Sequence, residues 1–255
     1  MPNETQRRFL AEIRHHLSGL REKIVSDFSE EEFDRELAAL DSDPVYSKFA
    51  LNCPEYVLVR FMGRISISIG RRLGEIYDKI PRFVAAARFS LTPAQVAPKF
   101  HGLELDVCLP FDRISSQDKE HVKAIVNRYL NLQPARNGVG IEIRYNFNPN
   151  DSSRLRKDVN MAEHLTENNL LPVYLIYSSI SPRDEAIARL TRAGWKFLIG
   201  DTALSFSRDL LGFDSNAILE TDAIRAEIRS EMQGILQEIF TSHAFSAAVR
   251  NQGNT

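Results

Sequence analysis

The chain contains 255 residues, of which 43% are hydrophobic, and its 32 basic and 34 acidic residues give a formal net charge of −2 at neutral pH. This balance excludes a protein that is coated in positive charge and binds nucleic acid indiscriminately, although a basic cleft on an otherwise acidic body is compatible with it. The two cysteines are too few for a disulfide framework and match no zinc motif, and no stretch approaches the roughly 18 apolar residues of a membrane span, so we expect a soluble, cytoplasmic protein without a membrane partner.

The first part of the chain is expected to be helical. Apolar residues recur at helical spacing over residues 4–40, and Ser29 followed by three glutamates resembles a capping box that begins a second helix. A further helix is expected over residues 54–80, interrupted or capped again near Gly70 and closed or kinked by Pro81.

The most positive segment of the chain lies within this helical part. Residues 60–88 hold seven basic and only two acidic residues. Basic side chains gathered in this way are suited to contact the phosphates of a DNA duplex, and we expect Arg71 and Arg72 to do so. Some basic residues of the segment must simply keep the helix in solution.

Two short runs, residues 102–109 and 139–147, show the alternation of apolar and charged residues that is typical of β-strands. In the first run, Asp106 lies on the charged face. In the second, Glu142 and Arg144 share the charged face. If the two strands lie in one sheet with their charged faces together, the two carboxylates are neighbours and the arginine lies beside them.

The remaining pattern predicts an α/β core over residues 101–255, with residues 1–100 as a helical region packed on it. Strands are expected over residues 171–177 and 195–199, and helices separate them. The first of these two strands is almost continuously apolar, as a strand covered on both faces should be. A long amphipathic helix, residues 223–245, completes the core.

Asp106, Glu142 and Arg144 supply the minimum that phosphodiester hydrolysis requires. Neighbouring carboxylates can hold a hard divalent cation, which neutralises phosphate oxygens and positions a hydroxide, and a cationic side chain stabilises the developing negative charge. The alternative is an exposed strand face with a surface salt bridge, which contributes little to stability. Glu104 shares the face of Asp106 and is either a further metal ligand or a solvated strand residue.

These residues resemble the motif of the PD-(D/E)XK nuclease superfamily, and specifically of type II restriction endonucleases. Asp106 matches the first acidic position, and Glu142 with Arg144 matches the Glu-X-Lys tripeptide. The order of elements also matches over about residues 65–200. The resemblance implies a restriction-endonuclease-like mixed sheet flanked by helices, Mg²⁺ bound by Asp106 and Glu142, and Arg144 stabilising the transition state. It also implies a homodimer, because two sites related by a twofold axis cut both strands of a palindrome.

The chain departs from the pattern of this family in two respects. Arg144 stands in place of the lysine, and an arginine, always protonated, can stabilise an anion but cannot act as a base. The 35 residues between the two acidic positions exceed a tight hairpin, so a helix must be inserted there. In the family a glutamate of the preceding helix often completes the site, and Glu75 matches this role loosely; the alternative is an ordinary ion pair with Arg71 or Lys79.

The helix expected after the second strand begins near residue 150 and carries Arg154, Arg156 and Lys157. The first turn of a helix presents free backbone N–H groups to anions, so we expect these residues to bind DNA; the alternative is a solvated basic face. Asn148, just before this helix, is expected either to read an adenine edge or to serve as an ordinary turn residue.

We therefore expect a Mg²⁺-dependent endodeoxyribonuclease that cleaves double-stranded DNA at a specific short sequence. One alternative is a non-catalytic DNA-binding or regulatory protein with a degenerate nuclease core, of which Arg144 would be the sign. Another is a scaffolding protein without a role in nucleic-acid binding. The final helix has an apolar stripe that is a candidate dimer surface, or else part of the core. Its members are Ile224, Ile228, Met232, Ile235 and Ile239.

Overall fold

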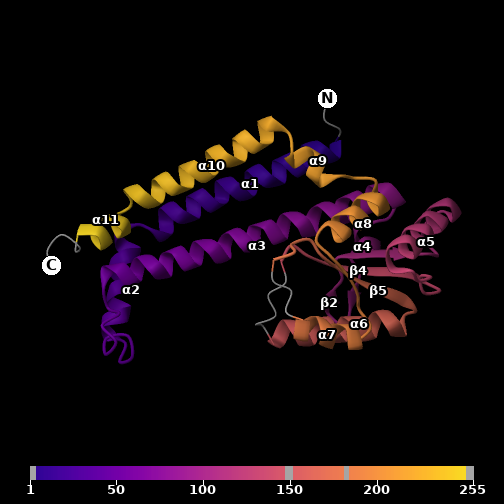
Figure 1. The fold of residues 1–255 in the computed structure, drawn as a ribbon, viewed down its shortest axis with the longest axis horizontal. Helices are drawn as coiled ribbons and strands as arrows, with labels where there is room; N and C mark the ends of the chain where they lie inside the picture. Colours follow the sequence, from indigo (N-terminus) through magenta and orange to yellow (C-terminus); the bar gives the residue numbers. More distant parts are fainter. Residues whose placement is uncertain (1–3, 147–151, 181–183, 251–255) are drawn as a thin grey trace. The chain divides into compact units, whose positions relative to one another are not determined.

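The computed structural model describes residues 4–146, 152–180 and 184–250 (Figure 1). The chain folds as two compact units, which we call the helical unit (residues 1–72 and 216–255) and the α/β unit (residues 73–215). This division differs from the expected boundary at residue 100. The physical reason is that the C-terminal helices bury their apolar faces against the N-terminal helices.

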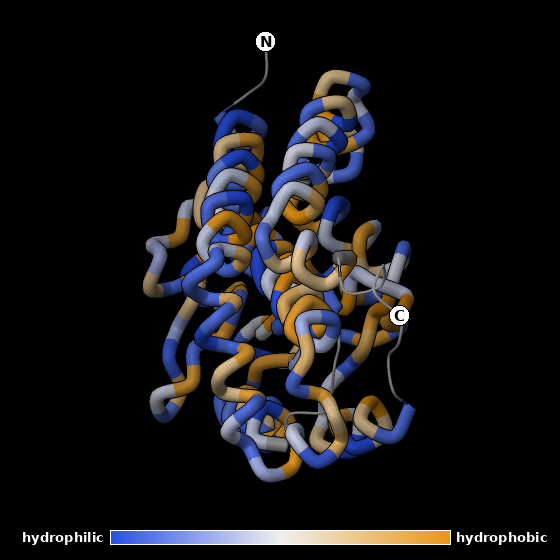
Figure 2. The backbone as a smooth tube through the Cα atoms, turned by 90° about the vertical axis from the view of Figure 1, so that its left-hand side faces the viewer, coloured by the Kyte–Doolittle hydropathy of each residue, from blue (hydrophilic) through white to orange (hydrophobic). Residues whose placement is uncertain are grey.

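The helical unit is built from amphipathic helices whose apolar sides face one another. Its helices are α1 (Glu4–Asp27), α2 (Glu30–Ser42), the N-terminal part of α3 (Pro54–Phe89), α10 (Asp222–Thr241) and α11 (His243–Arg250), preceded at the boundary by α9 (Ser215–Leu219). Helices α1 and α10 lie side by side (Figure 1). Hydrophilic and hydrophobic residues alternate along the helical tubes (Figure 2).

The expected cap at Ser29 is confirmed, because its side chain accepts a hydrogen bond from the backbone N–H of Glu32. The apolar stripe of the final helix belongs to the core: Ile224, Ile235 and Ile239 are buried within this unit. The dimer-surface interpretation of these three residues is therefore wrong. The single helix expected over residues 223–245 is also divided in two, with a break at Ser242.

The expected interruption of the third helix is wrong. Helix α3 continues through both Gly70 and Pro81 to Phe89. An internal proline removes one hydrogen bond and costs about 3 kcal/mol. Buried apolar residues on both sides of Pro81, including Ile80 and Val84, offset this cost by anchoring the helix to the core.

The α/β unit contains one four-stranded mixed sheet, so the general α/β class is confirmed. The strands of this sheet lie in the order β3 (Val107–Pro110), β4 (Gly138–Arg144), β5 (Leu170–Ile176) and β6 (Lys196–Ile199). Strand β3 is antiparallel to β4, whereas β4, β5 and β6 are parallel to one another. A separate short hairpin pairs β1 (Lys99–Phe100) with β2 (Leu103–Glu104).

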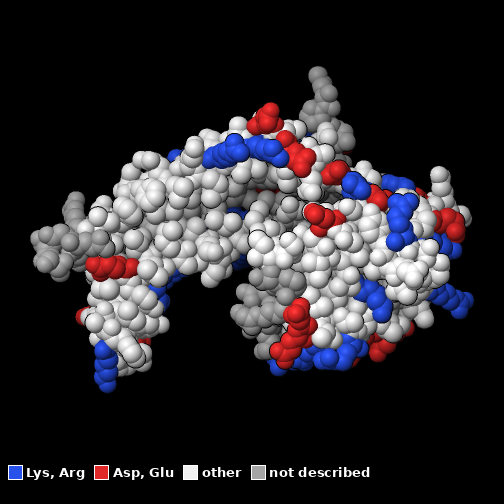
Figure 3. All heavy atoms as spheres, in the orientation of Figure 1, with Lys and Arg blue, Asp and Glu red and all other residues white. Residues whose placement is uncertain are grey.

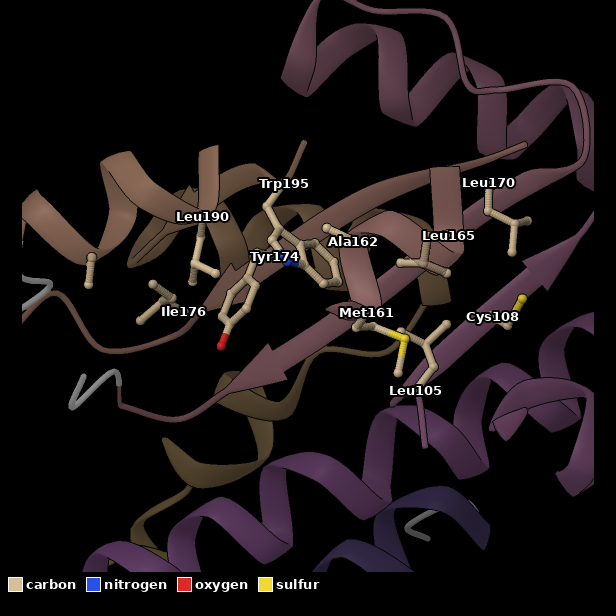
Figure 4. Close-up of a cluster of buried hydrophobic side chains, with 11 residues drawn as sticks. Leu105, Cys108, Met161, Ala162, Leu165, Leu170, Tyr174, Ile176, Leu190 and Trp195 are labelled. Atoms are coloured by element: carbon tan, nitrogen blue, oxygen red, sulfur yellow. The ribbon is translucent and has the colours of Figure 1, made fainter. Parts of the chain in front are cut away.

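Helices cover both faces of the sheet. Helices α6 (Ser152–Glu167) and α7 (Asp184–Arg192) lie on one side, and α5 (Ser116–Leu130) and α8 (Asp201–Leu211) lie on the other (Figure 1). The short α4 (Pro93–Val96) packs near β3. On the side of α6 and α7, Tyr174 and Trp195 are fully buried with ring centroids 5.2 Å apart (Figure 4).

The first charged run, residues 102–109, is not one strand. The chain leaves the hairpin after Glu104 and enters the sheet only at Val107, so Asp106 lies in the break between β2 and β3. The reason is visible in the backbone hydrogen bonds: the N–H of Leu105 bonds to the carbonyl of Pro98 instead of to β4. The inserted helix that the 35-residue spacing required is α5.

Candidate functional site

Asp106 is held at the strand break by a main-chain hydrogen bond. Its Oδ2 accepts a hydrogen bond from the N–H of Ile143 on β4 at 2.8 Å, and the residue is only 4% exposed. Val107 pairs with Ile141, so Ile143 lies where the next residues of a longer β3 would pair. The carboxylate therefore takes the place of the main-chain acceptor that the strand break removes.

Arg144, the last residue of β4, draws the carboxylates together. Its Nη1 donates to Asp106 Oδ2 at 3.2 Å and to the carbonyl oxygen of Ile143 at 2.8 Å. Its Nη2 forms an ion pair with Glu142 and lies 3.5 Å from Oδ1 of Asp158. Oxygens from three carboxylates and one carbonyl thus converge on one guanidinium. We call these four residues, Asp106, Glu142, Ile143 and Asp158, the oxygen cradle.

Asp158 is a member of this cluster that the motif does not include. It lies on α6, is 5% exposed, and accepts a hydrogen bond from the hydroxyl of Tyr174 at 2.9 Å. Its backbone carbonyl accepts the indole N–H of Trp195 at 2.7 Å. Helical periodicity could have found it, because Asp158 precedes Met161 and Leu165 by three and seven residues, on the face that packs against the sheet.

A second guanidinium, Arg82 of α3, also contacts the cluster. Its Nη2 donates to Oδ1 of Asp106 at 2.5 Å, and its Nη1 pairs with Glu104. The side chain of Glu104 is 42% exposed and lies 3.9 Å from Lys99, so Glu104 is a solvated strand residue. Arg82 carries no motif signal, because nothing in a helical sequence indicates which strand its face will meet.

The charges of the cluster are interdependent. Burial opposes the charge of Arg144, but Glu142 and the other acidic groups around it raise its pKa well above the ordinary value. Burial raises the pKa of Asp158, against the opposing effects of Arg144 and of the Tyr174 hydrogen bond. Burial likewise acts against the charge of Arg82, while Asp106 raises its pKa. The guanidinium groups therefore stay charged and compensate the buried carboxylates.

A pocket of about 410 Å³ opens beside the cradle. Arg154 and Lys157 of α6 line it, and so does Arg144. The remaining lining residues are Gly102, Leu103, Glu104, Glu142, Ser153, Asp158 and Met161. The expected residues Arg154 and Lys157 thus lie at the same pocket as Glu142 and Arg144, whereas Arg156 is exposed and does not line it.

The expected DNA-binding residues Arg71 and Arg72 do not line this pocket. Arg71 and Arg72 belong to the helical unit, where Arg72 donates to the carbonyl of Gly19 at 2.8 Å and is thus engaged in packing α3 against α1. Glu75 lies on α3 seven residues before Arg82, about 10 Å along the helix axis. Asn148 lies outside the described residues. On the face drawn in Figure 3, basic side chains form small groups beside acidic ones.

The oxygens of the cradle are of the type that binds divalent cations, but in the structure they are engaged by guanidinium groups. Carboxylate and carbonyl oxygens are the ligands that Mg²⁺ prefers. However, the residues the structure describes contain no group of three acidic, histidine or cysteine side chains that could hold a metal ion. Both oxygens of Asp106 are engaged by guanidinium or N–H groups, and Glu142 pairs with Arg144. The cations that these oxygens hold are Arg144 and, at Oδ1 of Asp106, Arg82.

The alternative of an exposed strand face is wrong in its exposure, because Asp106 and Glu142 are only 4% and 6% exposed. The salt bridge that it expected is present, between Arg144 and both carboxylates. Comparison with protein-family models, curated proteins and solved structures finds no match for this chain. Among the helices of the described ranges, none has the length and apolar character that a membrane crossing requires.

Proposed function

We propose that this protein is an endodeoxyribonuclease of the type II restriction kind, which hydrolyses phosphodiester bonds of double-stranded DNA at a specific sequence. One observation carries the proposal: the carboxylate just before β3, the carboxylate of Glu142 on β4 and the arginine two residues beyond it meet beside a pocket lined by Arg154 and Lys157. Acidic groups next to basic groups at one pocket are what cleavage of a phosphate backbone requires.

The order of elements supports the finer fold assignment within this proposal. Helix α3 precedes the antiparallel pair β3 and β4, and α6 then leads to the parallel strand β5. This is the order expected for a PD-(D/E)XK core. The first acidic residue stands directly before β3 and the tripeptide at the end of β4, so the antiparallel pairing of β3 with β4 brings the two together.

The residues of the pocket have distinct expected roles. Arg154 and Lys157 would bind phosphates of the DNA backbone, since both are exposed at the pocket and guanidinium and ammonium groups are good phosphate ligands. Arg144, charged at every accessible pH, would stabilise negative charge on the scissile phosphate and cannot serve as a base. Arg71, Arg72 and Glu75 are retained only as weaker candidates, because none of the three lines the pocket beside the cradle.

Magnesium is the cofactor that this proposal expects, with Asp106 and Glu142 as ligands. When bound, such an ion supplies charge neutralisation and an activated water. In the arrangement described above, Arg144 engages Oδ2 of Asp106 and Oε1 of Glu142, and Arg82 engages Oδ1 of Asp106, so metal binding requires these guanidinium groups to move away.

The pairing of Arg144 with these carboxylates favours a second candidate function. If Arg144 never leaves the carboxylates, the protein is a non-catalytic DNA-binding protein with a nuclease-like centre. The two functions share the phosphate-binding pocket and differ only in hydrolysis. Cutting both strands of a palindrome further requires two centres, so the nuclease proposal includes a homodimer.

Asp106→Asn distinguishes the two functions. We expect the wild type to nick plasmid DNA in Mg²⁺, and the variant to lose nicking by at least about a hundredfold while binding DNA normally in Ca²⁺. Asp112→Asn, at an exposed carboxylate, is the matched control and should cleave like the wild type. DNA binding without cleavage by the wild type would support the second function, and a wild type that neither binds nor cleaves DNA would refute both.

A further inference from the structure

We propose that a second pocket of the α/β unit binds a small aromatic phosphate monoester, such as a nucleoside monophosphate. Residues that line this pocket include Phe100, Phe111, Lys119, Arg136 and Asn168, and we call it the loop pocket. Its volume of about 580 Å³ lies within the roughly 300–1,000 Å³ that is usual for the binding sites of small molecules. The inference goes beyond the proposed cleavage of DNA and does not depend on it.

The loop pocket and the oxygen cradle lie at opposite ends of the sheet. Strand β4 begins at Gly138, beside the loop pocket, and ends at Arg144 in the cradle, and six residues of strand span roughly 20 Å. In Figure 4, Cys108 and Leu170, which line the loop pocket, lie at the end of the sheet away from Tyr174, whose hydroxyl donates to the cradle. The loop pocket is therefore a separate site.

Basic side chains give the loop pocket an excess of positive charge. The charged residues that line it are Asp112, Arg113, Lys119 and Arg136. Arg113 pairs with Asp112 at 3.1 Å, whereas neither Lys119 nor Arg136 forms an ion pair with a residue of the described ranges. These two positive charges match the charge of about −1.5 to −2 that a phosphate monoester carries near neutral pH, and ammonium and guanidinium groups are good phosphate ligands.

The wall of the loop pocket is aromatic and apolar. Phe100 and Phe111 line it, and Nζ of Lys119 lies 5.7 Å from the ring centroid of Phe111. Burial, together with the charge of Asp112, raises the pKa of the Cys108 thiol to about 12, so this lining residue is neutral and does not repel an anion. An aromatic surface next to a cation suits a ligand in which a planar ring carries a phosphate.

Two side-chain amides of the loop pocket offer hydrogen-bond acceptors. Nδ2 of Asn137 donates to the carbonyl of Asn168 at 2.9 Å, and Nδ2 of Asn168 donates to the carbonyl of His164 at 2.8 Å. Because these bonds orient both amides, their oxygens can accept from N–H groups of a heterocyclic ring. The backbone N–H of Phe111 donates to the carbonyl of Asn137 at 2.9 Å, so the loops around the pocket are already joined without a ligand.

Isothermal titration calorimetry with adenosine 5′-monophosphate, without DNA or metal ions, tests the proposal. Adenosine, which lacks the phosphate, and ribose 5-phosphate, which lacks the ring, are the matched probes. We expect the wild type to bind one adenosine 5′-monophosphate per chain, at least about tenfold more tightly than either matched probe. Absence of binding at millimolar concentration, or equal affinity for adenosine and its monophosphate, would overturn the proposal.

Variants locate the bound nucleotide. Arg136→Ala and Lys119→Ala should each weaken binding of adenosine 5′-monophosphate at least about tenfold, because each removes a charged phosphate ligand. Arg192→Ala, at an exposed arginine of α7 that does not line the loop pocket, should bind like the wild type. Unchanged affinity of both pocket variants, or weaker binding only in Arg154→Ala/Lys157→Ala, would place the nucleotide elsewhere and overturn the proposal.

Folding and DNA cleavage do not obscure the result. If circular dichroism shows that a pocket variant is unfolded, Arg136→Lys, which keeps the charge, replaces it and should bind between the wild type and the adenosine limit. The titration contains no DNA, so binding in the loop pocket stands even if the wild type never cleaves DNA. Conversely, a wild type that cleaves DNA but does not bind adenosine 5′-monophosphate would leave the nuclease proposal intact and remove only this site.

Discussion

Asp106 could be assigned to the cluster from the sequence, whereas Asp158, another carboxylate of the same cluster, could not. The neighbourhood of Asp106, Glu142 and Arg144 follows from strand alternation, because antiparallel strands bring the start of one beside the end of the next. Asp158 lies on α6 and Arg82 lies on α3. The approach of these two side chains to the strand residues depends on tertiary packing that no local sequence pattern encodes. The motif therefore led to three of the charged residues in the cluster and missed two.

The raised pKa of Asp158 leads to a prediction about how the stability of the protein depends on pH. Burial raises its pKa, so the folded state holds this proton to higher pH than the unfolded state does. Wild type should therefore lose stability relative to Asp158→Asn as the pH rises from about 4 through the raised pKa. Urea unfolding of both proteins between pH 4 and pH 7 measures this difference.

Asp118 is the matched control with the opposite sign. A hydrogen bond from Ser115, with the effect of Arg88, lowers its pKa. Relative to Asp118→Asn, the wild type should therefore lose stability as the pH falls below the ordinary carboxyl value of about 4, so this pair is compared between about pH 2 and about pH 4. If the wild type instead gained stability relative to Asp158→Asn as the pH rises, the raised pKa assigned to Asp158 would be wrong.

For the helices and strands, apolar periodicity predicted which segments form them better than it predicted the residues at which they break. Strand β5 and the cap of α2 agree with the sequence prediction. The breaks were missed because tertiary contacts decide them: packing on both sides holds α3 through Pro81, and the hydrogen bond of Leu105 to Pro98 divides the first charged run. That second break is what exposes the ladder N–H of Ile143 to Asp106.

The close approach of β3 to the start of β4 leads to a prediction about the stability of a glycine variant. Gly138 has a φ of +132°, and a Cβ there would lie 2.1 Å from the carbonyl oxygen of Leu109. Gly138→Ala should therefore lower the free energy of unfolding by at least about 3 kcal/mol. Gly74→Ala, within α3 of the same unit and with nothing within 4 Å of its added Cβ, should instead raise it by about 0.5–1 kcal/mol.

Chemical denaturation followed by the fluorescence of Trp195, which lies in the same unit, measures both variants. Unchanged stability of Gly138→Ala would show that β3 and β4 do not approach as closely as described. A destabilised Gly74→Ala would show that α3 has a neighbour at that position.

At the scale of the whole chain, the sequence indicated an all-helical part and an α/β part but not their composition. Apolar periodicity identifies which residues a helix buries, yet it does not say against which partner. The C-terminal helices therefore could not be assigned to the helical unit from their sequence. The core cluster of this unit joins residues near both chain ends, such as Leu20 and Ile235.

The two cores can be separated experimentally because the only tryptophan, Trp195, lies in the core cluster of the α/β unit. Ile235→Ala should destabilise the helical unit by about 2–5 kcal/mol and lower the denaturation midpoint seen by far-ultraviolet circular dichroism. The midpoint seen by Trp195 fluorescence should not change. Leu190→Ala, in the core of the α/β unit, should shift the fluorescence midpoint, and an equal shift of both signals by Ile235→Ala would contradict two separate cores.

The proposed DNA-cleaving centre of Asp106, Glu142 and Arg144 is tested by digestion of a plasmid of mixed sequence in Mg²⁺ with the wild type and with Glu142→Gln. We expect discrete fragments from the wild type and intact plasmid from the folded variant. Cleavage that persists in Glu142→Gln, or wild-type protein that leaves the plasmid intact at every Mg²⁺ concentration, would contradict it.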